Sequence, residues 1–459
     1  MFKTMKELFT SENKDLRHRI YFTLFALAIF ILGCSIRVPG TKDLTNNLGF
    51  LELINTIGGG ALKNFSIFAL GVMPYITASI IMQLLQMDII PYFTELRKQG
   101  HTGRQKISQI TRYLGIAFAF IEGYAFAFAF FGKSESPFQY MYIATVLTAG
   151  TALLMWMGDQ ITQKGLGNGM SLIIMAGIVA TLPQMFITAF NNLVTFEGTV
   201  QVITLGIVKF ILFIIVYFAI VIGMIFVQES ERRLPIQYAN KSTSAYGNAQ
   251  SFMPIKLNSA NVIPVIFASS LLAMPSIIAQ IIKKDSFSVF VQKYLTYTTP
   301  VGFVLYIIFI FIFSYFYTFI QMRPDEFAKN LQDNGGYIPG IRPGDDTRKY
   351  LSKILSRLTI LGATFLAIIA GLPIIFSRLT SLPTSVTIGG TGLLIVVGVA
   401  LETYKQLEGS ILTRSYKRGY SRRQWKILCL LRHLLLGKAL KPNWLLKNME
   451  YHIFQRATY

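Results

Sequence analysis

Side chains that could perform catalysis or bind a cofactor are sparse in this sequence. The chain contains 4 histidines and 2 cysteines, and their spacing matches neither a zinc site nor a redox motif. The glycine-rich stretch 165–169 lacks the Lys-Ser/Thr pair of a phosphate-binding loop and the spacing of a dinucleotide-binding loop. We therefore expect no catalytic centre, no bound metal and no cofactor.

Three ionisable residues lie within apolar segments, namely Glu122, Lys209 and Glu402. An ionisable side chain at membrane depth is a functional candidate by default. Glu122 either lines a polar path or lies near the outer interface, and the long side chain of Lys209 could snorkel toward the interface. A proton- or ion-coupled transporter usually needs a denser polar centre than these residues provide.

The composition excludes an ordinary soluble protein. Hydrophobic residues make up 53% of the chain and charged residues only 14%, against roughly 25% charged residues in a soluble globular protein. Lipid solvates most of the surface of a membrane-embedded protein, so little charge is needed there. The net charge of +21 would suggest nucleic-acid binding in a soluble protein, whereas in a membrane protein it usually marks basic cytoplasmic loops.

Ten apolar segments are long enough, at about 20 residues, to cross the hydrocarbon core as helices. They are 20–36, 65–87, 110–131, 140–158, 170–189, 200–227, 261–282, 299–321, 355–376 and 386–404. If the N-terminus is cytoplasmic, the great majority of the Lys and Arg residues fall on the cytoplasmic side, as the positive-inside rule requires. The sequence thus predicts an all-α polytopic membrane protein with both termini in the cytoplasm.

A short apolar segment between the first two spans, 51–65, is interrupted by three consecutive glycines at 58–60. It is too short to cross the membrane. Broken backbone at membrane depth is tolerated where it is buried in protein or lines a wet cavity. The segment is therefore either a re-entrant half-helix or a loop on the outer surface.

Two basic loops, 228–258 and 322–350, are each long for connections within a compact protein. The second contains Gly340-Ile341-Arg342-Pro343-Gly344, in which proline and glycine favour a turn that presents the arginine. Such loops could bind anionic lipid, ribosomal RNA or an acidic protein surface. Alternatively, their charge serves only to set the topology.

Several long motifs in this chain resemble those of the SecY family, whose members form the channel of the bacterial Sec protein translocon. The two longest are 66–84 (SIFALGVMPYITASIIMQL) and 156–175 (WMGDQITQKGLGNGMSLIIM). Shorter ones are 262–271, 340–344 and 389–397, together with the glycine-rich segment before residue 66. The resemblance covers about residues 15–420, in one order along the chain.

The resemblance implies two pseudo-symmetric five-helix halves of inverted topology, a kind of repeat known in membrane proteins. The halves would span 20–189 and 200–404, between a cytoplasmic N-terminal segment, 1–19, and a cytoplasmic C-terminal tail, 405–459. Residues 421–459 depart from the family pattern. They are basic and rich in leucine, and are either an amphipathic helix on an anionic membrane or the product of an altered reading frame.

The resemblance also implies a ring of aliphatic side chains at the constriction of the channel: Val72, Ile76, Ile174, Ile178, Ile266 and Ile395. The first two and the next two are i, i+4 pairs, so each pair would face one way on its helix. Aliphatic residues in helices are also ordinary packing residues. Val72 is smaller than the isoleucine common in the family, so the ring would be slightly looser there.

Further sites follow from the same resemblance. Segment 51–64 would be a plug that closes the outer funnel, with Leu51, Ile54, Ile57, Gly58, Gly59, Gly60, Leu62 and Asn64. A lateral gate would lie between spans two and three on one side and spans seven and eight on the other. Thr77 and Gln83 would lie near this gate, where they either ease its opening or form ordinary hydrogen bonds. The partner-docking loops would present Arg232, Arg233, Lys241, Arg342 and Arg348.

The implied function is a passive channel in the bacterial cytoplasmic membrane, rather than an enzyme. Its expected partners are the subunits SecE and SecG, the motor ATPase SecA, the ribosome, signal sequences and nascent polypeptides, and anionic lipids. Two alternatives stay open: a secondary transporter of a small solute, which also uses broken helices and inverted repeats, and a membrane scaffold or insertase without a pore.

Overall fold

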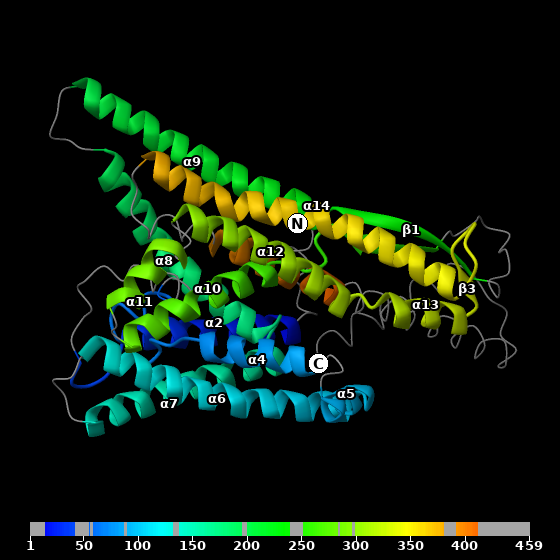
Figure 1. Cartoon of the computed structure of the whole chain (residues 1–459), viewed down its shortest axis with the longest axis horizontal. Coiled ribbons are helices and arrows are strands. Elements are labelled where there is room, and N and C mark those ends of the chain that lie inside the picture. Colours follow the sequence, from blue (N-terminus) through cyan, green and yellow to red (C-terminus); the bar gives the residue numbers. More distant parts are fainter. Residues whose placement is uncertain are drawn as a thin grey trace, which may run out of the picture. The chain divides into compact units, whose positions relative to one another are not determined.

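The computed structural model describes residues 14–41, 55, 58–86, 90–131, 137–194, 200–238, 251–282, 285–295, 299–380 and 392–411, and the statements below concern these residues. Nearly all regular structure is helical (Figure 1). The helices are α2 (Lys14–Cys34), α4 (Met73–Leu85), α5 (Pro91–Lys98), α6 (His101–Phe131), α7 (Pro137–Lys164), α8 (Gly169–Leu193), α9 (Val200–Glu229), α10 (Ile263–Ile282), α11 (Asp285–Phe290), the π-helical turn η4 (Val291–Leu295), α12 (Pro300–Gln321), α13 (Pro324–Asp333), α14 (Asp345–Thr380) and a helix over 392–411. The strands are β1 (Glu231–Tyr238), β2 (Ser251–Lys256) and β3 (Gly336–Tyr337).

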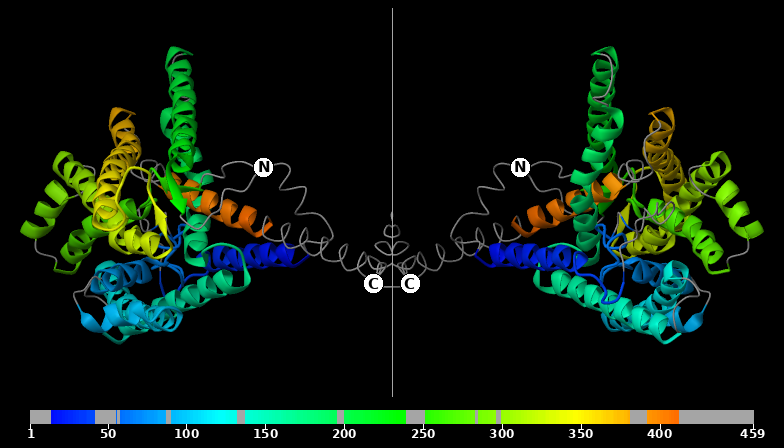
Figure 2. Two further views of the ribbon diagram at one scale, coloured as in Figure 1. Left: turned by 90° about the vertical axis from the view of Figure 1, so that its right-hand side faces the viewer. Right: turned by 90° about the vertical axis from the view of Figure 1, so that its left-hand side faces the viewer.

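One compact unit comprises Lys14–Thr403, and the arrangement described here is that of this unit. Within it, α4 and α7 both pack against α6, while α10 and α14 both pack against α12. The first group, coloured blue to teal, and the second, coloured green to orange, occupy different sides of the unit in Figures 1 and 2. Helix α10 also contacts α6, so it joins the two groups.

Six helices in the described part of the chain are long and apolar enough to cross a membrane. They are α2, α7, α8, a span within α9, a span that starts with α12, and the first part of α14. Two shorter apolar helices cover Met73–Leu85 and Ile263–Leu272. Together with α6 and the helix 392–411, these elements correspond one by one to the ten spans predicted from the sequence.

The second predicted span, 65–87, was wrong at its start. The chain runs in turns from 58 to 72, apart from a single bridge residue, and α4 begins only at Met73. Gly71 has a φ of 57°, in the left-handed region that ends or precludes a right-handed helix. Pro74 then occupies the first turn of α4, where its fixed φ suits the helix and its missing N–H leaves no partner unsatisfied.

The two basic loops contain regular structure that the sequence analysis did not anticipate. Strand β1 pairs antiparallel with β2 from Glu231↔Lys256 to Ile236↔Ser251. Its far end pairs with β3 at Gln237↔Tyr337, so the sheet order is β2-β1-β3. A separate hydrophobic cluster beneath the sheet contains Leu234, Ile236, Ile255, Leu331, Ile338, Leu351, Ile354, Leu355 and Leu358. We call the three strands, α13, the turn 338–344 and the first turns of α14 the loop subdomain.

Candidate functional site: an aliphatic cluster with a glycine segment against it

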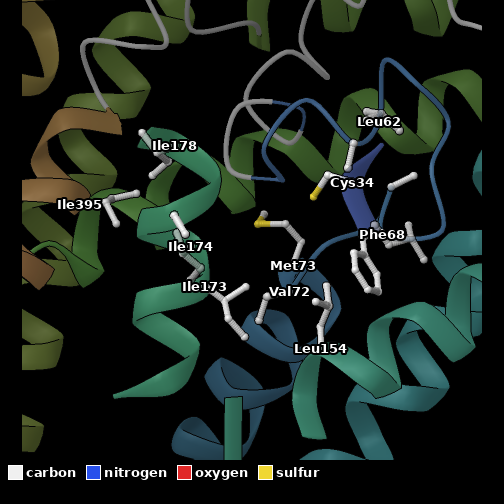
Figure 3. Close-up of a cluster of buried hydrophobic side chains, with 14 of the residues drawn as sticks. Cys34, Leu62, Phe68, Val72, Met73, Leu154, Ile173, Ile174, Ile178 and Ile395 are labelled. Atoms are coloured by element: carbon white, nitrogen blue, oxygen red, sulfur yellow. The ribbon is translucent and has the colours of Figure 1, made fainter. Parts of the chain in front are cut away.

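All six predicted ring residues belong to one hydrophobic cluster. Val72, Ile174, Ile178 and Ile395 are buried members, and Ile76 and Ile266 are partly buried residues packed against them. Figure 3 shows the four buried residues in this cluster, together with Met73 and Cys34. The cluster thus collects aliphatic side chains from the start of α4, from α8, from α10 and from the helix 392–411. That an opening passes between these side chains stays a prediction.

The i, i+4 argument assumed that Val72 lies inside a helix, but in the structure it does not. It is the residue before α4, with φ −101° and ψ 0°. Its carbonyl oxygen nevertheless accepts a hydrogen bond from the Ile76 N–H, with a nitrogen–oxygen distance of 3.1 Å. This bond spans four residues like a helical one, so the relation between the two side chains is preserved.

Helix 392–411 approaches α8 at a ring position. A Cβ atom built on Gly392 would lie 2.8 Å from Ile178 Cγ2, which is closer than real Cβ contacts. Ile178 is itself fully buried, with 0% of its surface exposed. Glycine at this position therefore lets the backbone of one half of the fold lie directly on a ring residue of the other.

The predicted plug is buried or partly buried where the structure describes it, except at Lys63 and Asn64. Ala61, Leu62 and Phe65 are 0–1% exposed, so the alternative of a loop on the outer surface is wrong for this part. The segment is held by Asn55, whose carbonyl accepts from Gly60 N at 2.8 Å and whose side-chain oxygen accepts from Lys63 N at 2.9 Å. Residues 58–65 run in turns rather than in a helix, with Asn64 exposed. Leu51, Ile54 and Ile57 lie outside the described residues.

The C-terminal end of this segment is anchored to the residues just after α2 and to α6. Val38 N donates to Phe65 O and Ile67 N donates to Ile36 O, both at 3.0 Å. The Phe65 ring packs edge-on against Phe131, with the ring centres 5.2 Å apart. The segment is thereby fixed at its C-terminal end, while its glycines reach the aliphatic cluster.

The two predicted gate residues use their polar groups within α4. Thr77 Oγ1 donates to Met73 O at 3.2 Å, and Gln83 Nε2 donates to Ser79 Oγ at 3.3 Å. These bonds correspond to the ordinary hydrogen-bonding role that the sequence analysis left open for both residues. A role of either side chain in gating stays a prediction.

The predicted docking residues lie on the loop subdomain, except Lys241, which is outside the described residues. Arg232, Arg233, Arg342 and Arg348 are exposed. Arg233 Nε pairs with Glu231 Oε1 at 2.9 Å, and Arg348 joins α14 to α13 through Asp325 at 3.2 Å. The predicted turn around Arg342 is present, because Gly340 and Gly344 have φ values of 82° and 98°. The Arg342 carbonyl accepts from Thr347 Oγ1 at 2.8 Å, which fixes this turn.

Two residues of α7 that pack against the turns before Val72, Gly150 and Thr151, could not be identified from the sequence. A Cβ atom on Gly150 would overlap the Ile67 carbonyl oxygen, and Thr151 Oγ1 donates to Gly71 O at 3.3 Å. Both contacts position the turns that lead into Val72. No local signal identifies them, because a glycine and a threonine in an apolar helix are unremarkable by themselves. In the part of the chain that the structure describes, no group of His, Cys, Asp or Glu side chains could hold a metal ion.

The family model for SecY matches residues 66–404 of this chain. The protein translocase subunit SecY of Halalkalibacterium halodurans is 46% identical over 433 residues, which cover 91% of this chain and 99% of that protein. The subunit of the same name from Staphylococcus epidermidis is 47% identical over 430 residues, with the same coverage.

Solved structures agree on the fold. A structure described as that of a protein conducting channel has a TM-score of 0.59 at 19% sequence identity and covers 85% of this chain and 92% of its own. A second, whose description says that the plug domain of the SecY protein stabilises the closed state, has a TM-score of 0.57 at 19% identity and the same coverage. The predicted fold class, an all-α membrane protein of ten transmembrane helices with a plug, is thereby confirmed. The division into two inverted halves stays a prediction. The chain belongs to the SecY family.

Proposed function

We propose that this chain is the central protein-conducting channel of a Sec translocase. It passes unfolded secretory polypeptides across a bacterial cytoplasmic membrane and releases transmembrane segments sideways into lipid. The observation that carries the proposal is the gathering of six aliphatic residues from both halves of the chain in one cluster, with a buried glycine segment against it.

The aliphatic ring suits a pore for many different polypeptides. An apolar constriction offers a permeating ion no replacement for its hydration shell, and a narrow apolar passage can dewet. It also offers a passing chain no hydrogen-bonding groups that would select one sequence. The ring would therefore block the passage of ions at rest and still admit unrelated polypeptides once it widens.

Sideways release needs a seam between the two halves that opens at low cost. The contact between α10 and α6 supports a seam at this place, and Thr77 and Gln83 are the gate candidates on the neighbouring α4. Beyond the membrane helices, Arg97 Nη2 on α5 lies 3.7 Å from Glu326 Oε1 on α13. Because the Glu326 side chain is 64% exposed, this ion pair contributes little, about 0–1 kcal/mol, and would not resist opening.

The loop subdomain is the proposed docking site for SecA during export and for the ribosome during insertion. SecE and SecG are the proposed companion subunits, and SecA the source of ATP hydrolysis. Both termini would be cytoplasmic, the halves would span 20–189 and 200–404, and the basic tail 405–459 would lie near anionic lipid. The pairing of β1 with β3 supports one joint docking surface, because it brings the two loops together.

The test of this function is reconstitution of the chain with SecE in liposomes, followed by addition of SecA, ATP and a preprotein. Protease-protected preprotein that depends on SecA and ATP is the expected result. Saturable, gradient-driven uptake of a small solute without SecA, and no protected preprotein, would instead establish the transporter alternative.

Replacing Arg342 by alanine is expected to weaken SecA binding to the reconstituted channel about tenfold, which corresponds to about 1.4 kcal/mol. The arginine is exposed at the tip of a turn with two left-handed glycines, and arginines of this kind often dominate the binding energy of an interface. The matched control is Arg357→Ala, which removes an exposed arginine from α14 outside the two loops. Equal binding by both variants and the unchanged protein would contradict the assignment.

A further inference from the structure

The connection between β2 and α10 contains a residue in an uncommon backbone conformation. Asn261 has a φ of 57°, in the left-handed region that few residues other than glycine adopt, asparagine being one of them. Helix α10 begins two residues later, at Ile263. Asn258, which is buried with 7% of its surface exposed, donates from Nδ2 to Asn261 O at 2.9 Å. The turn that leads into α10 is therefore fixed by its own side chains.

The side chain of Asn261 connects this turn to two further helices. Gln228 Nε2, at the end of α9, donates to Asn261 Oδ1 at 3.1 Å. In the helix 392–411, a Cβ atom on Gly398 would lie 3.2 Å from Gln228 Nε2 and 3.3 Å from Asn261 Oδ1. These distances are shorter than most real Cβ contacts, so the backbone at Gly398 lies directly on both amides. We call Gln228, Asn258 and Asn261 the amide clamp.

Two ring residues lie about one helical turn from the amide clamp. Val262, directly after Asn261, accepts a hydrogen bond at its carbonyl oxygen from Ile266 N at 3.4 Å. On the other helix, Ile395 precedes Gly398 by three residues, which is just under one turn. The clamp thus joins α10 and the helix 392–411 close to the point where each contributes an isoleucine to the aliphatic cluster.

We propose that the amide clamp positions Ile266 relative to Ile395 so that the ring closes at rest. This role rests on the proposed channel function and extends it to three polar residues outside the ring. A narrow apolar constriction excludes water and ions, whereas a wider one does not, so a small change in the direction of α10 would open a leak. Hydrogen bonds suit this role because their strength depends steeply on angle.

Two substitutions of Asn261 separate its hydrogen bond from its backbone conformation. Asn261→Gly permits the positive φ without strain but removes the acceptor for Gln228. Asn261→Asp keeps an oxygen acceptor, and aspartate also tolerates the left-handed region. If Asn261 served only the turn, glycine would replace it at least as well as aspartate. The clamp predicts the opposite order.

Asn261→Gly is expected to raise the resting ion conductance of the channel with SecE in planar bilayers about fivefold, because wider states of the ring become populated. Asn261→Asp should stay near the unchanged protein. Gln228→Leu removes the donor and should match Asn261→Gly. The double substitution should exceed neither, because both changes remove the same bond.

The matched control is Ser259→Ala, in the same connection. Ser259 Oγ donates to Lys256 O at 3.0 Å, so this change also removes a side-chain hydrogen bond, but one that stays next to β2. The conductance of this control should be unchanged. Equal leaks from Ser259→Ala and Asn261→Gly would show that any disturbance of the connection opens the ring, and the clamp would be overturned.

A second readout follows the ring directly. Ile395 is buried with 5% of its surface exposed, and Ile395→Cys can be labelled specifically once Cys34→Ala and Cys429→Ser have removed both native thiols. Adding Asn261→Gly is expected to accelerate alkylation at position 395 by a water-soluble maleimide about fivefold, whereas Asn261→Asp should not. Monodisperse protein with unchanged helical circular dichroism excludes unfolding as the cause.

A substitution in the ring itself distinguishes failure of the clamp from failure of the channel. If Ile178→Asn raises the conductance while Asn261→Gly changes neither readout, the clamp is wrong and the ring stands. If Asn261→Gly and Asn261→Asp leak equally, the bond to Gln228 does not position the ring, and the clamp is again wrong. If neither Ile178→Asn nor Asn261→Gly leaks, the ring and the clamp are both wrong.

Discussion

Replacing Ile178 by asparagine is expected to raise the ion conductance of the resting channel about tenfold or more, because the amide supplies hydration partners in an apolar constriction. Ile178 is fully buried in the aliphatic cluster, where Gly392 of the opposite half lies against it. Such a substitution also leaves a buried polar group short of partners, at a cost of about 1–3 kcal/mol. The measurement is single-channel recording of the chain with SecE in planar bilayers.

The matched control for this prediction is the next residue along α8. Val179 is 44% exposed, so Val179→Asn places the same amide outside the aliphatic cluster. Its conductance should equal that of the unchanged protein. A leak of the same size from both variants would indicate general disruption of α8. Tight closure in Ile178→Asn would exclude this residue from the ring.

Replacing Gly150 by leucine is expected to be the most destabilising of the substitutions considered, with a loss of about 3 kcal/mol in the free energy of unfolding. A Cβ atom at Gly150 would overlap the Ile67 carbonyl oxygen, which is backbone and cannot rotate away. The adjacent bond from Thr151 Oγ1 to Gly71 O would be lost when α7 moves. The measurements are the unfolding temperature in detergent and the amount of protein that accumulates in the membrane.

Gly223→Leu is the control, because it adds the same side chain to an apolar helix at a position with open space around the added Cβ. It should change the unfolding temperature little. If Gly150→Leu were as stable as this control, the chain between Ile67 and Gly71 would have to relax easily. The inference that α7 packs tightly against the turns before Val72 would then be wrong.

The sequence predicted the membrane helices well because their signal is local. A helix in lipid must satisfy its backbone internally and present apolar side chains outward, so composition over about 20 residues is sufficient to find it. The start of α4 was the exception. Residues 65–72 are as apolar as a span, yet the positive φ of Gly71 keeps them in turns.

The loop subdomain could not be predicted in the same way. Strand β3 has two residues, too few for a period-2 pattern to be recognised. Its partner in β1 is distant in sequence: the side-chain hydrogen bond from Tyr337 to Gln237 spans 100 residues. Such a pairing depends on where α9 and α12 place the two loops.

The sequence by itself determined the ten spans, the basic loops and, through its motifs, the family, and it predicted the six ring positions. These are properties of composition or of contiguous residues, which local physics and resemblance can read. Only the tertiary structure decided that Gly392 meets Ile178, that Gly59 meets Gly177, and that α7 supports the turns before Val72. Each of these contacts joins segments distant in sequence, and in each a glycine without a side chain allows the close approach. A single glycine carries no local signal of what approaches it.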